Sequence, residues 1–211
     1  LTPGHTLRLS TQIAKSDCKN SGAFFMTEAG VAEELPTEPI GYLKVVTLGE
    51  STLSAEELTS IAGNLANGAV IDLGEATFAT TEFPMDFARK TNLQEIALPR
   101  NIQTFASEAY SGAFYNCTNL KRVTLPEGLT AIGANCFRQC SQLESIELPS
   151  SVRTLDIYAF YGCKLLTSVV IPEGVEAIPR FIFDSCTALT DVTLPSTLKS
   201  IGTEAFEATG L

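Results

Sequence analysis

Histidine and tryptophan are almost missing from the 211-residue sequence, which contains one histidine, His5, and no tryptophan. A single histidine near the N-terminus leaves no Ser-His or Cys-His pair for nucleophilic catalysis. The sequence also contains no G-x-S-x-G motif and no phosphate-binding loop. Zinc sites usually need converging cysteine and histidine ligands, which one histidine does not supply. We therefore predict a protein that is not an enzyme and that binds no metal and no cofactor.

Basic residues are also few, since Lys and Arg total 14 against 24 Asp and Glu, for a formal net charge of -10. The resulting anionic field opposes phosphate backbones and anionic lipid, so binding to nucleic acid and to membrane surfaces is disfavoured. No run approaches the roughly 18 consecutive apolar residues of a membrane-spanning helix. Because 45% of the residues are hydrophobic and only 18% are charged, we expect the chain to fold around a core.

The N-terminal residues 1–11 lack the basic start and the apolar run of a signal peptide. Because the sequence opens with Leu1 and not with methionine, we expect a processed or trimmed chain whose export signal is not part of this sequence. The N-terminus therefore does not decide the compartment.

Cysteine is present six times, and its spacing indicates a repeat instead of a disulfide framework. Four cysteines follow one another at intervals of 23 residues: Cys117, Cys140, Cys163 and Cys186. In stacked coils such residues lie about 4.8 Å apart, whereas bridged Cβ atoms prefer about 3.8 Å. We therefore predict buried, reduced thiols, and we do not interpret Cys136 and Cys140 as a metal-binding pair.

Proline and phenylalanine share this period. The prolines are Pro99, Pro126, Pro149, Pro172 and Pro195, separated by 23 residues except for a first step of 27. The phenylalanines are Phe114, Phe137, Phe160, Phe183 and Phe206, all separated by 23. The longer step indicates an insertion of four residues near 107–112. Units of this length cannot close a core alone, so neighbouring units are expected to stack and share one core.

Each unit has the pattern of a single coil. It opens with apolar residues at the first, fourth and sixth places, as in Leu120, Val123 and Leu125, and the last two face one side of a strand. Pro126 then ends the strand because proline cannot donate to a ladder. The mixed spacing of the following IGANCFRQC favours a short helical turn. Each coil thus consists of a strand, a turn, a short helical or irregular piece and a second turn. This pattern predicts an α/β solenoid.

The first half follows the same plan more loosely, with a helix as its return segment. Ser54 and Glu57 form a capping box, and Asn67–Gly68 supplies the stop. Between them runs one apolar stripe: Leu58, Ile61, Ala62 and Leu65. Strands are expected to end at seven positions: Leu48, Leu73, Leu98, Leu125, Leu148, Ile171 and Leu194.

The period also divides the chain. Residues 1–42 do not fit it, and we predict that they form an N-terminal capping segment with residues 6–13 as its ordered part. Residues 43–211 form the solenoid, with degenerate repeats in 43–92 and regular repeats in 93–211. Because Leu211 stands where another unit would begin, we expect that a C-terminal cap is missing or that the natural protein continues.

The unit L-x-x-I/V-x-L-P-x-x-L/V-x-x-I-(x)-A-F-x-x-C resembles the BspA-like leucine-rich repeats of bacterial surface proteins. The resemblance is close over 93–211 and looser over 43–92. It implies a right-handed solenoid with a parallel sheet on its concave face and short helical or irregular segments on its convex face. It further implies secretion or surface display, adhesion and protein binding. It transfers no catalytic residue, because the motif contains only scaffold positions.

The third and fifth residues of each strand should point out of the concave sheet and form the first candidate binding surface. They are small, polar and mildly acidic, with Arg122 as the one cation: Asp72, Glu95, Arg122, Thr124, Ser145, Glu147, Ser168, Asp191 and Thr193. Because this lining has no aromatic platform for a sugar, it favours a protein partner, for example a host extracellular or cell-surface protein. The alternative is a solvated sheet face without a partner.

A second candidate surface consists of aromatic residues outside the core columns: Tyr110, Tyr115, Tyr158, Tyr161 and Phe181. An exposed cluster of this kind can anchor a partner or a glycan, whereas the alternative is packing within the outer turns. The sequence thus predicts a non-catalytic protein-binding or adhesion module, extracellular or on the cell surface. A carbohydrate-binding accessory module and a structural spacer remain the alternatives.

Overall fold

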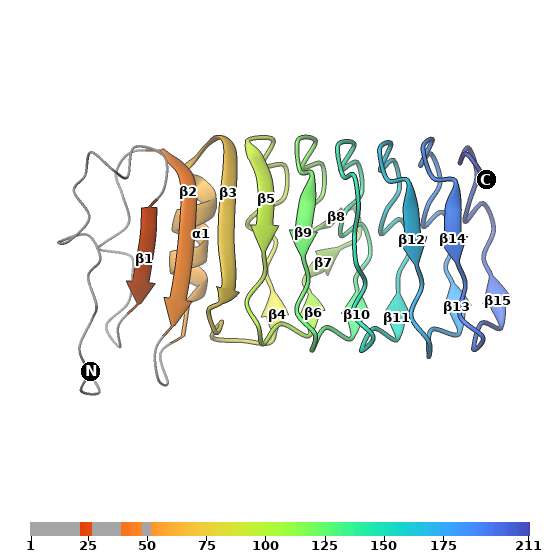
Figure 1. The fold of residues 1–211 in the computed structure, drawn as a ribbon, viewed down its shortest axis with the longest axis horizontal. Coiled ribbons are helices and arrows are strands. Elements are labelled where there is room, and N and C mark those ends of the chain that lie inside the picture. Colours follow the sequence, from red (N-terminus) through yellow and green to blue (C-terminus); the bar gives the residue numbers. More distant parts are fainter. Residues whose placement is uncertain (1–21, 27–38, 48–51) are drawn as a thin grey trace.

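The computed structural model describes residues 22–26, 39–47 and 52–211. Successive coils lie side by side along one axis, and each coil returns to the same face of the molecule (Figure 1). The fold is a parallel β-solenoid, which confirms the predicted repeat architecture. The right-handed winding and the concave position of the sheet remain predictions.

The main sheet is built from parallel strands in the order β1-β2-β3-β5-β9. These strands are β1 (Gly22–Met26), β2 (Ile40–Thr47), β3 (Leu65–Glu75), β5 (Leu93–Ala97) and β9 (Arg122–Thr124). Farther along the same face, β12 (Ser168–Val170) pairs in parallel with β14 (Asp191–Thr193) (Figure 1). The strand predicted to end at Leu148 is not formed, so pairing along this face is interrupted at residues 143–149. This coil is held by a backbone hydrogen bond from Glu144 to the carbonyl of Lys121 at 3.2 Å.

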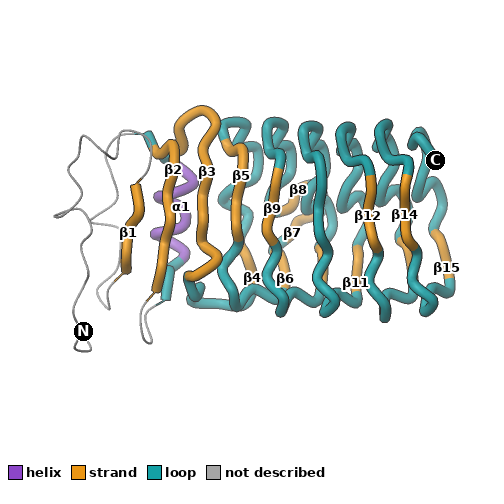
Figure 2. The backbone as a smooth tube through the Cα atoms, viewed as in Figure 1, coloured by secondary structure: helices purple, strands orange, loops and turns teal. Residues whose placement is uncertain are grey.

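A second series of two-residue parallel strands lies outside the main sheet, and the sequence did not predict it. The strands are β4 (Glu82–Phe83), β6 (Thr104–Phe105), β10 (Ala131–Ile132), β11 (Thr154–Leu155), β13 (Ala177–Ile178) and β15 (Ser200–Ile201). They pair as β4-β6, β10-β11 and β13-β15, and turns connect them to the main sheet (Figure 2). Where the sequence predicted a short helical or irregular piece, residues 134–139 form turns and no regular helix. Asn135 and Gln139 have φ angles of 56° and 64°, and such left-handed residues interrupt a helix.

Helix α1 (Ala55–Gly63) begins at the predicted capping box. The backbone amide of Glu57 donates to Ser54 Oγ at 3.2 Å, and the Ser54 amide donates to Glu57 Oε2 at 2.7 Å. The predicted stop at Asn67–Gly68 is wrong, because the helix ends at Gly63 and the buried Leu65 already begins β3. Within the part of the chain that the structure describes, no helix has the length and apolar character needed to cross a membrane.

The predicted four-residue insertion forms a small antiparallel hairpin of β7 (Ser107–Glu108) and β8 (Ser111–Gly112). Tyr110 lies at its tip with 82% of its surface exposed. The regular coil continues directly after the hairpin, so the extra residues leave the stacking intact.

The N-terminal end of the sheet extends beyond the predicted solenoid boundary at residue 43. Strand β1 pairs in parallel with β2, from Gly22 opposite Leu43 to Met26 opposite Thr47. The segment 6–13, expected to be the ordered part of the cap, lies outside the described residues. The capping role of residues 1–42 therefore stays a prediction.

The core confirms the phenylalanine repeat. The rings of Phe114, Phe137, Phe160 and Phe183 are fully buried and stack face to face with 5.4 Å between successive centroids. Phe206 continues the stack at 5.6 Å but is only partly buried, because the last described coil has no following coil over it. Coil stacking therefore supplies the core that a single repeat lacks.

The cysteine column runs beside this aromatic stack and is buried, as predicted. Each thiol donates a hydrogen bond to the carbonyl of a phenylalanine in the preceding coil: Cys117 to Phe87 at 2.9 Å, Cys140 to Phe114 at 3.1 Å, Cys163 to Phe137 at 3.2 Å, and Cys186 to Phe160 at 3.1 Å. Burial raises the pKa of Cys117 to about 12, and it also raises the pKa of Cys140 well above the ordinary value of a thiol.

We expect these thiols to resist iodoacetamide in the native protein at pH 8 and to react fully in denaturant. The thiolate is the nucleophile, and burial both raises the thiol pKa and blocks access. Intact-protein mass spectrometry over time measures the labelling, and a Cys18→Ser variant removes the cysteine that lies outside the described residues. Rapid native labelling, or a mass lower by about two units per cysteine pair, the signature of a disulfide, would contradict the expectation.

Candidate functional site

The first candidate surface, called the sheet face below, consists of the outward side chains of β3, β5, β9, residues 143–149, β12 and β14. The strand register aligns Asp72 with Ala97 and Thr124 in one column, and Glu95 with Arg122 in the other. At the far end Ser168 lies opposite Asp191, and Val170 lies opposite Thr193. Ser145 and Glu147 are exposed on the coil between the two sheet segments. All nine predicted residues thus lie on this face.

Charges on the sheet face are mostly paired. Arg122 forms an ion pair with Glu95 across the β5–β9 ladder. Lys44 on β2 lies 3.4 Å from Asp72 and also pairs with Glu75, and these two carboxylates raise the pKa of Lys44. Arg122 is therefore not the only cation on this surface, because the neighbouring strand β2 contributes Lys44.

A groove of about 440 Å³ opens on the sheet face between β9 and residues 145–150, where strand pairing is interrupted. Its lining combines four of the predicted polar residues with an apolar set. The polar residues are Arg122, Thr124, Ser145 and Glu147, and the apolar residues are Val123, Leu125, Ile146 and Leu148. The groove thus offers hydrogen-bonding groups, an ion pair at its rim and apolar contact area within one concavity.

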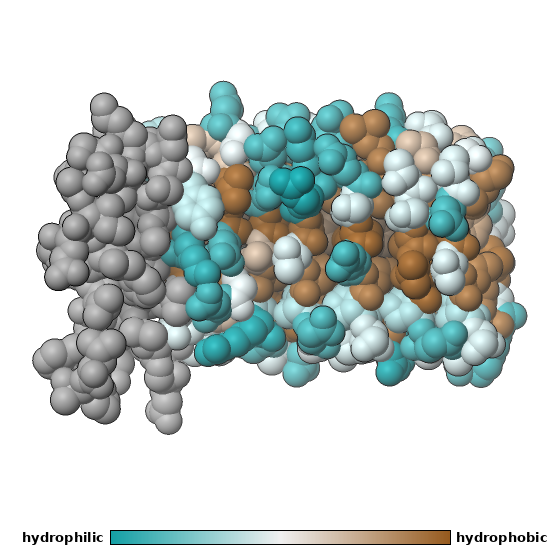
Figure 3. Space-filling view, viewed as in Figure 1, coloured by the Kyte–Doolittle hydropathy of each residue, from teal (hydrophilic) through white to brown (hydrophobic). Residues whose placement is uncertain are grey.

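The C-terminal part of the sheet face is more apolar than expected from the sequence. Val170 is 62% exposed and Leu194 is 42% exposed, and hydrophobic side chains gather over β12 and β14 (Figure 3). Leu194 belongs to a core column, whose members Leu125 and Ile171 are only 8% and 2% exposed. It is exposed because it lies in the last described coil. Sequence periodicity missed it by treating every member of the column as buried.

Four of the five residues predicted for the second candidate surface lie together in the structure. Tyr158 packs edge-on against Tyr161 at 5.7 Å and stacks on Phe181 at 5.0 Å. Tyr115 joins them through the side chain of Arg138. Tyr110 is separate, because no ring contact links it to this cluster among the described residues. The cluster is half-buried, so both partner binding and packing of the turns account for it.

Arginines complete the aromatic cluster, and the sequence analysis missed them. The Arg138 guanidinium lies 5.0 Å from the ring centre of Tyr158, 5.2 Å from Tyr161 and 5.9 Å from Tyr115. Arg180 lies 5.9 Å from the ring of Phe181. The 23-residue period contained the signal, because it places Arg138 between Tyr115 and Tyr161 in one column. Since these rings already contact a cation, they are poor free platforms for a sugar.

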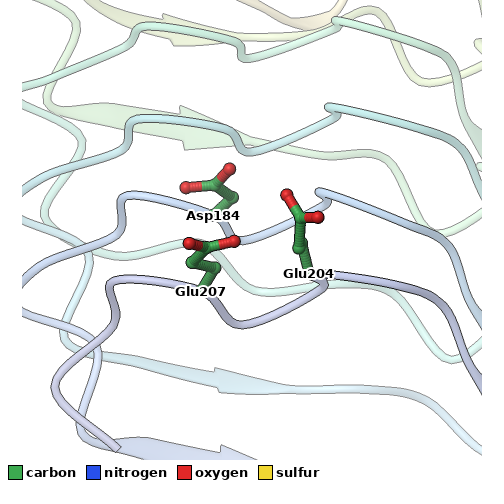
Figure 4. Close-up of side chains that lie close together, drawn as sticks. All are labelled: Asp184, Glu204 and Glu207. Atoms are coloured by element: carbon green, nitrogen blue, oxygen red, sulfur yellow. The ribbon is translucent and has the colours of Figure 1, made fainter.

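Three carboxylates, from Asp184, Glu204 and Glu207, lie close together in the last two coils (Figure 4). Their oxygens are within 4.8 Å of one another. Glu204 is exposed, and loss of hydration beside its neighbours, a hydrogen bond with Glu207 and repulsion from Glu207 and Asp184 raise its pKa. Exposed acidic residues alone do not define a metal site, and the sequence gave no reason to group them.

The repeat pattern has a direct match among known families. Residues 108–211 match the BspA type leucine rich repeat region in six copies. Residues 108–211 are therefore a region of BspA-type leucine-rich repeats. This confirms the resemblance that the sequence motif indicated, and it places the regular BspA-type repeats in the half of the chain with the stacked phenylalanines.

Solved structures share the fold of these BspA-type repeats. A leucine rich cell surface protein from Faecalibacterium prausnitzii is 33% identical with a TM-score of 0.54, and the match covers 64% of this chain and 36% of that one. The chain thus spans little more than a third of that protein. A leucine rich repeat protein from T. pallidum is 19% identical, with a TM-score of 0.53 and coverage of 90% and 81%. No curated protein sequence matches the chain.

Proposed function

We propose that the chain is a non-catalytic interaction module of a secreted or cell-surface bacterial protein and that it binds a protein through the sheet face. The groove between β9 and residues 145–150 carries the proposal, because it collects Arg122, Thr124, Ser145 and Glu147 around apolar contact area. A centre of apolar surface with a polar, charged rim is the usual anatomy of a protein interface. The cell-surface location of the Faecalibacterium relative supports the setting.

A protein ligand fits this surface better than a glycan does. The groove lining contains no aromatic ring, whereas sugar sites use such rings as stacking platforms. Parallel coils also extend the surface on both sides of the groove, to Lys44 and Asp72 at one end and to Val170 at the other. An extended surface of this kind suits a folded partner or a long segment.

We expect Arg122→Glu to weaken binding of the protein partner about tenfold or more, which corresponds to about 1.4 kcal/mol or more. The change reverses the charge at the groove rim and places a carboxylate opposite Glu95. Lys199→Glu is the matched control. Lys199 also forms an exposed ion pair, with its Nζ 2.8 Å from Oε1 of Glu176, and it does not line the groove. Biolayer interferometry against a panel of purified host extracellular proteins finds the partner and compares the variants.

Two outcomes would overturn the assignment of the sheet face. In the first, Arg122→Glu binds as tightly as wild type while Tyr115→Ser combined with Tyr161→Ser abolishes binding, which would move the site to the aromatic cluster. In the second, a glycan array gives specific binding and the protein panel gives none. That result would favour the carbohydrate-binding alternative.

A further inference from the structure

Two columns of side chains run along the turns outside the main sheet, and we call them the outer columns. The first contains Tyr115, Arg138, Tyr161, Asp184 and Glu207, and the second contains Asn135, Tyr158, Phe181 and Glu204, all at intervals of 23 residues. Backbone hydrogen bonds fix the first column from coil to coil: Asn116 to the Arg138 carbonyl at 2.8 Å, Gln139 to Tyr161 at 2.7 Å, Gly162 to Asp184 at 2.9 Å, and Ser185 to Glu207 at 2.8 Å. The order of groups along this surface is therefore rigidly set.

The outer columns change sign along their length. At one end the Arg138 guanidinium lies among tyrosine rings, with Tyr158 closest at 5.0 Å. At the other end are the three carboxylates of Asp184, Glu204 and Glu207 (Figure 4). A surface that is cationic at one end and anionic at the other is complementary to itself when one copy is reversed.

The cationic end has hydrogen-bond donors without acceptors. Arg138 Nη1 donates to Asn135 Oδ1 at 3.1 Å, which fixes the orientation of the Asn135 amide. Nδ2 of Asn135 and Nε of Arg138 are buried and have no acceptor within the described part of the chain. Asn135 itself is only 1% exposed. Both donors are enclosed within the turns, so an approaching molecule meets the half-buried side chain of Arg138 and the tyrosine rings around it.

The acidic end lacks a cation within the described part of the chain. Its three carboxylates repel one another, and no ion pair joins any of them to a cation among the described residues. The raised pKa of Glu204 reflects loss of hydration within this cluster together with the repulsion. A guanidinium supplied from outside would relieve this repulsion, and a carboxylate would pair with the half-buried side chain of Arg138 at the other end.

We propose that the outer columns bind a second copy of this chain in an antiparallel, two-fold symmetric dimer. A two-fold axis midway between the coils of Tyr161 and Asp184 reverses the order of both columns. The reversal places three pairs of accessible side chains opposite each other: Arg138 and Glu207, Tyr161 and Asp184, and Tyr158 and Phe181. One arrangement therefore brings a carboxylate to the Arg138 side chain, a guanidinium to the repelling carboxylates, and aromatic rings to each other.

The second copy fits better than an unrelated acidic partner, because an acidic partner would satisfy only the Arg138 end. The interface spans four coils spaced 5.4–5.6 Å apart at the aromatic stack, so its area is small. Interfaces below about 1,200 Å² belong to weak, transient complexes. The chain's net charge of -10 also opposes close approach of two copies. The dimer is therefore expected to form in the micromolar range or above.

Sedimentation velocity of the full chain at rising concentration tests the proposal. We expect a dimer whose population rises with concentration. Glu207→Arg should raise its dissociation constant at least tenfold, which corresponds to about 1.4 kcal/mol, and Arg138→Glu should raise it as well. The double variant should return the dissociation constant to within about threefold of wild type. Restoration by the charge swap is specific to a pair that meets across the two-fold axis.

A further variant protects the test against misfolding of Arg138→Glu. Tyr158 has a φ angle of 58°, a left-handed conformation that asparagine adopts more readily, and Asn135 occupies the same column at 56°. Tyr158→Asn should therefore remain folded by circular dichroism while losing its ring contact with Phe181 across the dimer. We expect its self-association to fall at least tenfold.

Ile201→Lys is the control for a competing surface, because Ile201 is 52% exposed at the open C-terminal end of the stack. We expect this variant to associate like wild type. A chain that is monomeric up to millimolar concentration overturns the proposal. A dimer that Ile201→Lys abolishes, or that ignores Glu207→Arg and Tyr158→Asn, also overturns it.

Discussion

Replacing Phe160 by alanine should lower the free energy of unfolding by about 3–5 kcal/mol, the usual cost of truncating a fully buried aromatic side chain. Phe160 has no exposed surface and stacks on Phe137 and Phe183, each at 5.4 Å. The alanine leaves a cavity between two rings that close-packed coils cannot easily fill. Because the affected coil is in the middle of the solenoid, the repeats on its two sides should also lose cooperativity.

Phe206→Ala is the matched control for this prediction. Phe206 stacks on one side only, against Phe183 at 5.6 Å, and is partly exposed. Its truncation should cost clearly less than that of Phe160. Urea denaturation followed by circular dichroism measures both variants. If Phe160→Ala lowers the free energy of unfolding by less than about 1 kcal/mol, the ring is not part of a shared core. Such a loss is smaller than the usual cost of truncating a buried aromatic side chain.

Gly112→Ala is expected to destabilise the protein by about 1–3 kcal/mol, the usual cost of overpacking. A Cβ atom at Gly112 would lie 2.7 Å from the carbonyl oxygen of Ala134 and 2.8 Å from the Cα of Cys136. Both are backbone atoms of the following coil, so no side-chain rotation relieves the clash. The alanine would force two stacked coils apart at the base of the hairpin.

Gly128→Ala provides the control, because its Cβ would meet nothing closer than the carbonyl oxygen of Ile102 at 4.0 Å. We expect a change within about 0.5 kcal/mol, as for most exposed substitutions. Thermal and urea unfolding of the two variants give the comparison. Equal stabilities for Gly112→Ala and Gly128→Ala would show that adjacent coils are not in close contact at residue 112.

The core was predictable because its signal repeats. A fixed interval of 23 residues places each phenylalanine above the next, and the same interval aligns the thiols of Cys140 and Cys163. The start of α1 was predictable for a different reason, since the Ser54–Glu57 capping box is a local hydrogen-bonding pattern. Both signals are encoded by residues whose partners lie at known offsets in the chain.

Other parts of the fold depend on contacts that a single repeat does not reveal. Residues 132–140 were interpreted as a short helical turn, but Ala131–Ile132 pairs with the next coil as a strand and residues 134–139 form turns. Left-handed residues such as Asn135 keep these turns from forming a regular helix. Helix α1 is shorter than expected because the chain after Asn64 joins the main sheet, where the backbone of Ile40 donates to the Asn64 carbonyl at 2.6 Å.

The candidate surfaces were predicted as sets of residues, and the structure adds their pairing. Alternation along the strands placed Arg122 and Glu147 on one face, but it did not indicate the groove that lies between them. That groove depends on interrupted strand pairing at residues 143–149. The tyrosines were noticed because they are aromatic, whereas Arg138 was overlooked although it stands in the same column.

Hydrogen exchange of the chain, free and saturated with its protein partner, tests most directly whether the sheet face is the binding surface. We expect slowed exchange at β9 and at residues 143–150, the two walls of the groove, and unchanged exchange in the outer turns around Arg138. Partner-dependent protection confined to those outer turns or to α1, with no change at the groove, would contradict binding through the sheet face.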